Sequence, residues 1–148
     1  MVKNIQNKQK MKILILCTGN SCRSQMAEGF LKSFDPNLEV YSAGTKQEKK
    51  VNPYAVTVMK EKRINLEQNV PKNVDQFLDQ SFDYVITVCD SAKETCPIFM
   101  GHVKHKLHMG FEDPAGASGT EEEILKKFRE ISDQIESEFN KLYNTKLK

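Results

Sequence analysis

The chain has 148 residues, of which 39% are hydrophobic and 28% are charged, and its formal net charge is +2. This length and composition predict one globular domain with a full hydrophobic core. No basic patch interleaved with aromatic residues occurs, so we do not expect a nucleic-acid partner. No apolar stretch approaches the length of a membrane span, so we expect no membrane association.

Residues 1–10 are polar and include three lysines. They lack the apolar core of a signal peptide, so we predict a cytoplasmic protein. We interpret 1–10 as a disordered tail or an artificial extension, with Met11 as an alternative start. In the cytoplasm the four cysteines would be reduced at rest.

A short loop follows the first predicted strand. The apolar run 13–16 predicts a buried strand, and the spacing of apolar residues from Met26 to Phe34 is close to that of a helix. Between them lies the sequence Cys17-Thr-Gly-Asn-Ser-Cys-Arg-Ser24. A loop in this position favours anion binding, because free backbone N–H groups and the helix dipole both point at it.

The residue types in this loop predict covalent chemistry on an oxyanion. Small side chains let successive amides curl into a nest, and Arg23 adds a planar cationic fork for a tetrahedral anion. The same field favours the thiolate of Cys17, which we predict to be a nucleophile toward phosphate or an analogue. The predicted substrate-binding residues are Thr18, Gly19, Asn20, Ser21, Cys22, Arg23 and Ser24. The alternative is a structural cysteine at a strand end beside a surface arginine.

The remaining elements alternate along the chain. We expect a strand at 39–44, a helix from Asn52-Pro53 to about Lys62, and a strand at 82–89. One or two helical turns at 91–95 and a weaker strand at 107–111 follow. The last helix opens at Thr120, where Glu123 completes a capping box.

Alternating strands and helices predict an α/β fold, with a four-stranded parallel sheet flanked by helices. Ligands bind such sheets beyond the carboxyl ends of the strands. Cys17, Cys89 and the loop 111–116 all follow predicted strands. We therefore expect them to meet at one rim of the sheet.

Two further cysteines, Cys89 and Cys96, are seven residues apart. On a continuous helix they would lie roughly 10 Å apart along the axis, too far for a disulfide, which needs Cα atoms within about 7 Å. They could bond only if the segment unwound; otherwise they are a pair of buried hydrophobic cysteines. No close Cys pair indicates zinc, and the histidines at 102, 105 and 108 are interpreted as incidental, so we predict no metal and no cofactor.

Asp113-Pro114 lies in the last loop before the final helix. Near the nucleophile, Asp113 could protonate a departing oxygen. Alone, an Asp-Pro pair is more often a turn.

Together these residues resemble the low-molecular-weight protein-tyrosine-phosphatase fold, and more closely its thioredoxin-coupled arsenate reductases. The resemblance is carried by segments 17–29, 41–44, 52–53 and 110–116 and by the pair Cys89 and Cys96-Pro97. It covers residues 11–148 and implies a single catalytic domain.

The resemblance implies a role for each cysteine but Cys22. Cys17 would attack arsenate, with Arg23 and the loop amides holding the oxyanion and Ser24 steadying the thiolate. Asp113 would be the acid that helps water depart. Cys89 would release arsenite by forming a Cys17–Cys89 disulfide, and Cys96 would convert it to Cys89–Cys96 for reduction by thioredoxin.

The resemblance also implies support beneath the loop. Some relatives bind potassium there through an Asn, a Glu, a Ser and an Asp; Asn20, Glu28 and Ser42 match the first three. The fourth position holds Lys72, and we expect its ammonium to replace the ion and to bond Glu28 and Asn20. The alternative is a solvated Lys72, with Asp75 as the acid.

Two other functions compete with arsenate reduction. One is a tyrosine phosphatase, whose members generally have tyrosines after the Asp-Pro, where this chain has Ala115-Gly116. The other is a non-catalytic thiol protein that binds arsenicals. We favour the reductase, with a weak phosphatase side activity, because neither alternative needs the full set of Arg23, Cys89 and Cys96.

Overall fold

The structure is a computed structural model that describes residues 10–90, 94 and 96–148. Four parallel strands form one sheet in the order β2-β1-β3-β4. They are β1 (Lys12–Cys17), β2 (Glu39–Gly44), β3 (Ser81–Thr87) and β4 (His102–His108). The predicted α/β class and the four-stranded parallel sheet are therefore confirmed.

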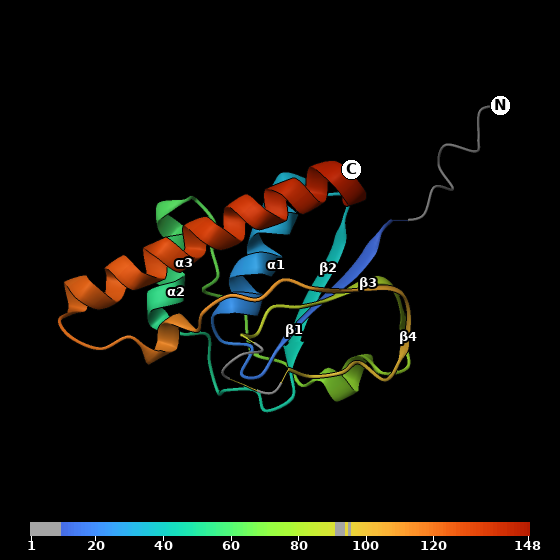
Figure 1. Cartoon of the computed structure of the whole chain (residues 1–148), viewed down its shortest axis with the longest axis horizontal. Coiled ribbons are helices and arrows are strands. Elements are labelled where there is room, and N and C mark those ends of the chain that lie inside the picture. Colours follow the sequence, from blue (N-terminus) through green and yellow to red (C-terminus); the bar gives the residue numbers. More distant parts are fainter. Residues whose placement is uncertain (1–9, 91–93, 95) are drawn as a thin grey trace.

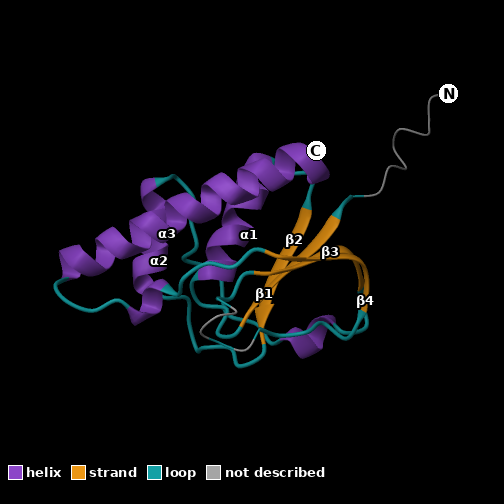
Figure 2. Ribbon diagram, viewed as in Figure 1, coloured by secondary structure: helices purple, strands orange, loops and turns teal. Residues whose placement is uncertain are grey.

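Three helices pack on one face of the sheet (Figures 1 and 2). They are α1 (Arg23–Phe34), α2 (Pro53–Glu61) and α3 (Glu121–Leu142). Within the described residues, no helix has the length and apolar character needed to cross a membrane. Two short 3-10 turns, η2 (Val74–Phe77) and η3 (Pro114–Gly116), lie in the loops, and η4 (Tyr143–Leu147) extends the last helix.

β1 alternates between two apolar cores, as a central strand buried on both faces must. Ile13 and Ile15 face the helices, whereas Leu14 and Leu16 face a smaller cluster around Phe82. This second cluster contains Phe77 of η2 and Phe99. The carboxyl end of β1 is therefore held from both sides, which fixes the position of the loop that follows.

Two helix starts predicted from the sequence are confirmed. The Asn52 side chain caps α2 by accepting from the Tyr54 amide. At α3, Thr120 and Glu123 form the reciprocal capping box. Polar side chains at these positions satisfy amides that the first helical turn leaves without partners.

Strand β4 differs from the prediction, which placed it at 107–111. It spans His102–His108 and pairs in parallel with β3, so that Thr87 lies opposite His108. Most of its side chains are exposed because it is the edge of the sheet, and lysine-rich edge strands carry little apolar signal. The expected helical turns at 91–95 fall mostly outside the described residues. Asp90, Glu94 and Cys96 lie in no helix or strand.

Candidate active site

The loop between β1 and α1 turns its carbonyl groups outward. Thr18 accepts from the Lys46 amide, Gly19 from Glu48 and Ser21 from Asn52. Asn20 has a left-handed φ of 53°, a conformation typical of anion-binding nests. The Asn20 amide points the other way, toward the Cys17 sulfur in the pocket.

A glycine at the end of β2 lets this loop pack tightly. A Cβ on Gly44 would lie 2.2 Å from the Thr18 carbonyl oxygen and 3.1 Å from the Asn20 nitrogen. Any side chain at this position would push the loop away from β2. Cys17 and Gly44 are partners in the sheet register, so the same contact places the cysteine.

The Cys17 side chain lies at the base of the loop and is only 2% exposed. Its Sγ is 3.0 Å from the Ser24 hydroxyl and accepts the Asn20 backbone N–H at 3.3 Å. The Asn20 side-chain amide donates to Ser24 Oγ at 2.8 Å. Because Asn20 occupies an acceptor position of Ser24, the Ser24 hydroxyl proton is free to point at the Cys17 sulfur.

Arg23 is buried at the start of α1 and holds a carboxylate. Nη1 and Nη2 each donate to one oxygen of the Glu94 carboxylate, and the bond from Nη2 is 3.0 Å long. Nη1 also donates to the Phe111 carbonyl oxygen at 3.0 Å. Burial alone would lower the pKa of Arg23, but the bond to Glu94 and the charges of Asp113 and Cys17 raise it. The same bond lowers the pKa of Glu94.

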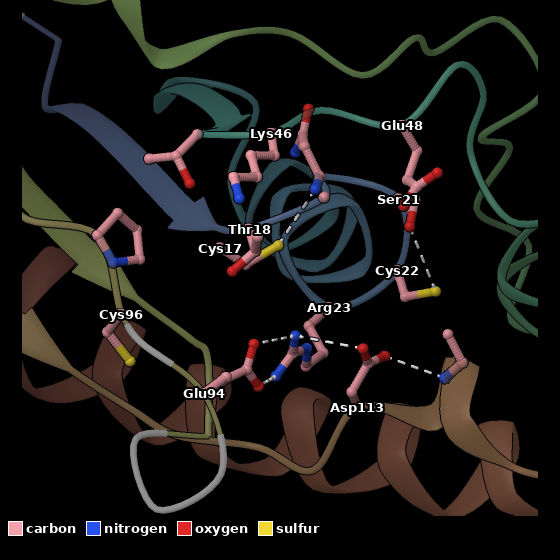
Figure 3. A pocket seen from close by; sticks show the side chains of 15 residues that line it. Cys17, Thr18, Ser21, Cys22, Arg23, Lys46, Glu48, Glu94, Cys96 and Asp113 are labelled. Carbon is pink, nitrogen blue, oxygen red and sulfur yellow. Dashed lines mark hydrogen bonds and ion pairs between the residues drawn. The ribbon is translucent and has the colours of Figure 1, made fainter.

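These groups line one pocket of about 680 Å³, drawn in Figure 3. The Cys17 sulfur faces its interior, and Arg23 lies between Glu94 and Asp113. The pocket contains every predicted substrate-binding residue except Ser24, which contacts Cys17 from below. The lining is Cys17, Thr18, Gly19, Asn20, Ser21, Cys22, Arg23, Thr45, Lys46, Glu48, Glu94, Cys96, Pro97, Asp113 and Ala115.

The Asp113 carboxylate contacts both the turn that follows it and Arg23. One carboxylate oxygen caps the 3-10 turn η3 by accepting from the Ala115 amide at 3.0 Å. The other lies 3.6 Å from Arg23 Nη2, at the edge of the pocket. The turn therefore positions the carboxylate beside the anion loop.

Cys89 and Cys96 form a disulfide, with Cα atoms 5.8 Å apart. On a continuous helix these two Cα atoms would lie about twice as far apart. Cys89 is 0% exposed, whereas Cys96 is half-buried and lines the pocket with Cys17. The three cysteines predicted to exchange disulfides are thus brought to the same rim of the sheet.

Cys22 has a different environment from Cys17, although it belongs to the same loop. It is a free thiol and is 3% exposed. Burial raises its pKa to about 12, and the Ser21 hydroxyl offsets this only in part. Cys22 is therefore a neutral, unreactive thiol near neutral pH.

A chain of hydrogen bonds lies beneath the loop. The side-chain nitrogen Nδ2 of Asn20 donates to the Ser42 hydroxyl, which in turn donates to the Glu28 carboxylate. Glu28 also accepts from the Lys32 ammonium at 2.6 Å. Asn20 Oδ1 accepts from the Lys72 backbone amide at 2.9 Å. The polar groups expected around a potassium ion thus bond to one another and to Lys32.

The contact predicted for the Lys72 ammonium is wrong. Its Nζ donates to the Val70 carbonyl oxygen at 3.2 Å, and the cation paired with Glu28 is Lys32, one turn along α1. Burial lowers the pKa of Lys72, while the charge of Glu28 opposes that shift. Asp75, the alternative acid, is exposed at the start of η2.

Sequence reasoning missed Glu94 and the pocket residue Lys46. A charged residue between two cysteines has no periodicity that marks it as a ligand, so only the fold shows that Glu94 reaches Arg23. Within the described residues, the one group with metal-ligand spacing is Cys89, Cys96 and His108. A disulfide leaves no thiolate to bind an ion, so this group is not a metal site in the present redox state.

The residues from 12 to 148 match the family model of low molecular weight phosphotyrosine protein phosphatases. The chain belongs to this family. An arsenate reductase of Halalkalibacterium halodurans is 46% identical over 127 residues, which cover 85% of this chain and 90% of the relative. The resemblance inferred from the sequence is therefore confirmed.

Solved structures of arsenate reductases have a similar fold. One described as an arsenate reductase in the phosphate binding state has a TM-score of 0.77 and 29% identity, covering 93% of this chain and 99% of its own. A thioredoxin-dependent arsenate reductase of Corynebacterium glutamicum has a TM-score of 0.66 and 23% identity, covering 93% of this chain and 62% of its own. The second likeness shows a shared fold only.

Proposed function

We propose that this protein reduces arsenate, a small tetrahedral oxyanion, to arsenite. The observation that carries the proposal is the pocket shared by Cys17, Arg23 and the Cys89–Cys96 disulfide. Reducing arsenate to arsenite takes two electrons, and converting two thiols into one disulfide supplies two. The relatives named as arsenate reductases support the choice of substrate.

The geometry suggests a role for each residue in the first step. The Cys17 thiolate attacks arsenic, while Arg23 and the loop amides hold the remaining oxygens. Ser24 steadies the thiolate through its hydroxyl. Asp113 donates a proton to the oxygen that leaves as water.

The two later steps move the oxidation from Cys17 to the pair Cys89 and Cys96. The Cys89 thiolate attacks the Cys17 sulfur, the sulfur–arsenic bond breaks, and arsenic keeps that electron pair and departs as arsenite. The Cys96 thiolate then attacks Cys89, forming the Cys89–Cys96 bond and releasing Cys17 as a thiolate. A Cys89–Cys96 disulfide, the bond present in the structure, is the product that this sequence of steps predicts.

We further propose that thioredoxin, a dithiol protein of the cytoplasm, reduces Cys89–Cys96. Cys96 is the more accessible sulfur, because Cys89 is fully buried. Ile98 and Met100 are 76% and 81% exposed just beyond it, and such apolar side chains suit a protein partner. Cytoplasmic location accords with this, since dithiol reductants maintain thiols there.

Loop support is assigned to Asn20, Glu28, Ser42 and Lys72. The first three form a chain of hydrogen bonds under the loop, and Lys72 contributes its backbone amide. Lys32 adds a cation to this support through its ion pair with Glu28. Because a main-chain group makes the Lys72 contact, substituting its side chain should matter less than substituting Asn20.

A phosphatase is the second candidate, supported by the family and by the Cys17, Arg23 and Asp113 arrangement. Ala115 follows the Asp-Pro and lines the pocket, so no aromatic side chain stands there to pack on a tyrosine ring. We therefore assign phosphatase chemistry as a weak side activity. A non-catalytic protein that binds arsenicals would need neither Arg23 nor the loop fastened around Cys17.

The deciding experiment measures NADPH oxidation with thioredoxin, thioredoxin reductase and arsenate. Arsenate-dependent NADPH consumption supports the reductase. Hydrolysis of aryl phosphates without that consumption would identify a phosphatase, and binding of arsenite without either activity would identify a thiol-binding protein.

A further inference from the structure

His108 lies beside the disulfide at the carboxyl end of the edge strand β4. One nitrogen of its ring and the sulfur atoms of Cys89 and Cys96 all lie within 4.8 Å of one another. Its Nδ1 is 2.7 Å from the hydroxyl of Thr87, its partner in the sheet register. Thr87 therefore fixes the ring by one nitrogen and leaves Nε2 for another partner.

Gly110 provides the space for this ring. A Cβ at position 110 would lie 3.0 Å from His108 Nε2 and 3.1 Å from the Cys89 carbonyl oxygen. The imidazole and Cys89 thus flank the same glycine. The other strand histidine with a ring contact, His105, stacks on Tyr84 with centroids 4.8 Å apart. His105 and His108 are three residues apart on a strand and point to opposite faces.

Reduction of this disulfide has an obvious difficulty. A reductant reaches the half-buried Cys96 more easily than the fully buried Cys89. Attack on Cys96 makes Cys89 the leaving group, and it leaves as a thiolate within the protein. A buried negative charge is costly unless it is paired or neutralised, and a poorer leaving thiolate slows exchange.

We propose that His108 is the acid that protonates Cys89 when the Cys89–Cys96 disulfide is reduced. The reductant is a dithiol, and its thiolate attacks the Cys96 sulfur. A bond forms between the reductant and Cys96 while the Cys89–Cys96 bond breaks. The Cys89 sulfur keeps the electron pair of the broken bond and takes a proton from the His108 imidazolium. Solvent then reprotonates the exposed ring.

The second half of the reaction does not need His108. The second thiolate of the reductant attacks the reductant sulfur that is bonded to Cys96. This step releases Cys96 as a thiolate and leaves the reductant as a disulfide. Two electrons pass from the dithiol to the protein. The inference rests on the proposed function only in taking a dithiol as reductant, and it assigns no role to His108 in the attack on arsenate.

The test follows reduction of the purified oxidised protein, without arsenate, by dithiothreitol and by thioredoxin. Rapid quenching with an alkylating agent and mass spectrometry give the rate at which Cys89 becomes a free thiol. We expect His108→Ala to slow this step at least about tenfold, as loss of a positioned acid does. The control is His105→Ala, which removes a histidine from the same strand and should leave the rate unchanged.

Two measurements separate proton transfer from a merely structural role. Added imidazole should restore a large part of the rate in His108→Ala and have no effect on the unmodified protein. His108→Gln keeps a hydrogen-bonding side chain but no acid, so it should remain slow. Gly110→Ala should also slow release of the Cys89 thiol, because the added Cβ should displace the His108 ring while the histidine itself is kept.

The outcomes are distinct. A rate within about twofold of the unmodified protein in folded His108→Ala would overturn the inference, as would full activity in His108→Gln. If dithiothreitol reduces the unmodified protein but thioredoxin does not, the proposed partner is wrong while the role of His108 is still decided by the dithiothreitol series.

Discussion

Two loops leave the carboxyl ends of the neighbouring strands β1 and β3, and each begins near a cysteine that the proposed reaction uses. The loop between β1 and α1, called the fixed loop below, is held by hydrogen bonds to its carbonyl groups, by the Asn20 side chain and by its close packing on Gly44. The β3 loop is held by one disulfide and by Glu94 on Arg23. Binding a transition state needs a fixed frame, whereas disulfide exchange needs a segment that can be released and refastened.

The largest effect should come from Cys17→Ser in the fixed loop. It should reduce both arsenate reduction and aryl phosphate hydrolysis by at least about 10³-fold, because both use this nucleophile. The NADPH-coupled assay and release of nitrophenol measure the two activities. Retention of either one would show that the fixed loop is not the common site.

Cys96→Ala should distinguish the functions of the two loops. Multiple-turnover reduction of arsenate should be abolished because no Cys89–Cys96 disulfide can form, whereas aryl phosphate hydrolysis should be largely intact because water completes that reaction. Both rates are measured on the same folded preparation. Parallel loss of the two activities would refute this division between the loops.

Asp113→Asn should slow chemistry on the oxyanion by about 10²-fold or more, because it removes the proposed acid. The neighbouring η3 cap survives, since the Asn side chain can still accept from the Ala115 amide. Reduction of Cys89–Cys96 by thioredoxin should be unchanged and serves as the internal control. A variant with normal turnover would leave Asp113 with the role of a turn residue only.

A smaller effect is expected from Glu94→Gln, which tests the contact between the two loops. In the oxidised protein, loss of the carboxylate frees Arg23, so the dissociation constant for phosphate should fall by roughly threefold. Isothermal titration at constant ionic strength measures it. Glu130→Gln is the control, because it removes an equal charge from α3, and an equal gain in both variants would point to net charge alone.

The smallest effect concerns Cys22, whose pKa of about 12 keeps it protonated. Because the raised pKa favours the thiol, only about one molecule in 10⁴ carries the Cys22 thiolate at pH 8. Iodoacetamide should leave Cys22 unmodified from pH 6 to 9 in the folded protein and modify it after denaturation. Labelling of native Cys22 at pH 7 would show that the fixed loop activates both of its cysteines.

Local chemistry made the fixed loop predictable. The strand before it, its small residues and the helix after it are consecutive in sequence, as are the Asn52 and Thr120 caps. Even the Glu28–Lys32 pair could have been found, because residues four apart on a helix face one another. The ammonium predicted for this role, that of Lys72, contacts the Val70 carbonyl oxygen instead.

The loop after β3 was predictable only in part. Sequence spacing showed that a Cys89–Cys96 disulfide requires an unwound segment, but the contact of Glu94 with Arg23 depends on where that segment lies in space. The position of His108 depends on the register of β4, which was predicted several residues too late. Long-range placement of polar side chains leaves little trace in a single sequence, because an edge strand lacks a clear apolar pattern.

The central position of β1 in the sheet also bears on how the protein folds. β1 must pair with β2 and β3, and β4 then joins β3. A chain in which β4 has not yet joined has Cys17 at the end of its strand, but its Arg23 lacks the Phe111 carbonyl and Asp113. Parallel strands that are distant in sequence pair slowly. Recovery of activity during refolding should therefore follow the docking of the edge strand.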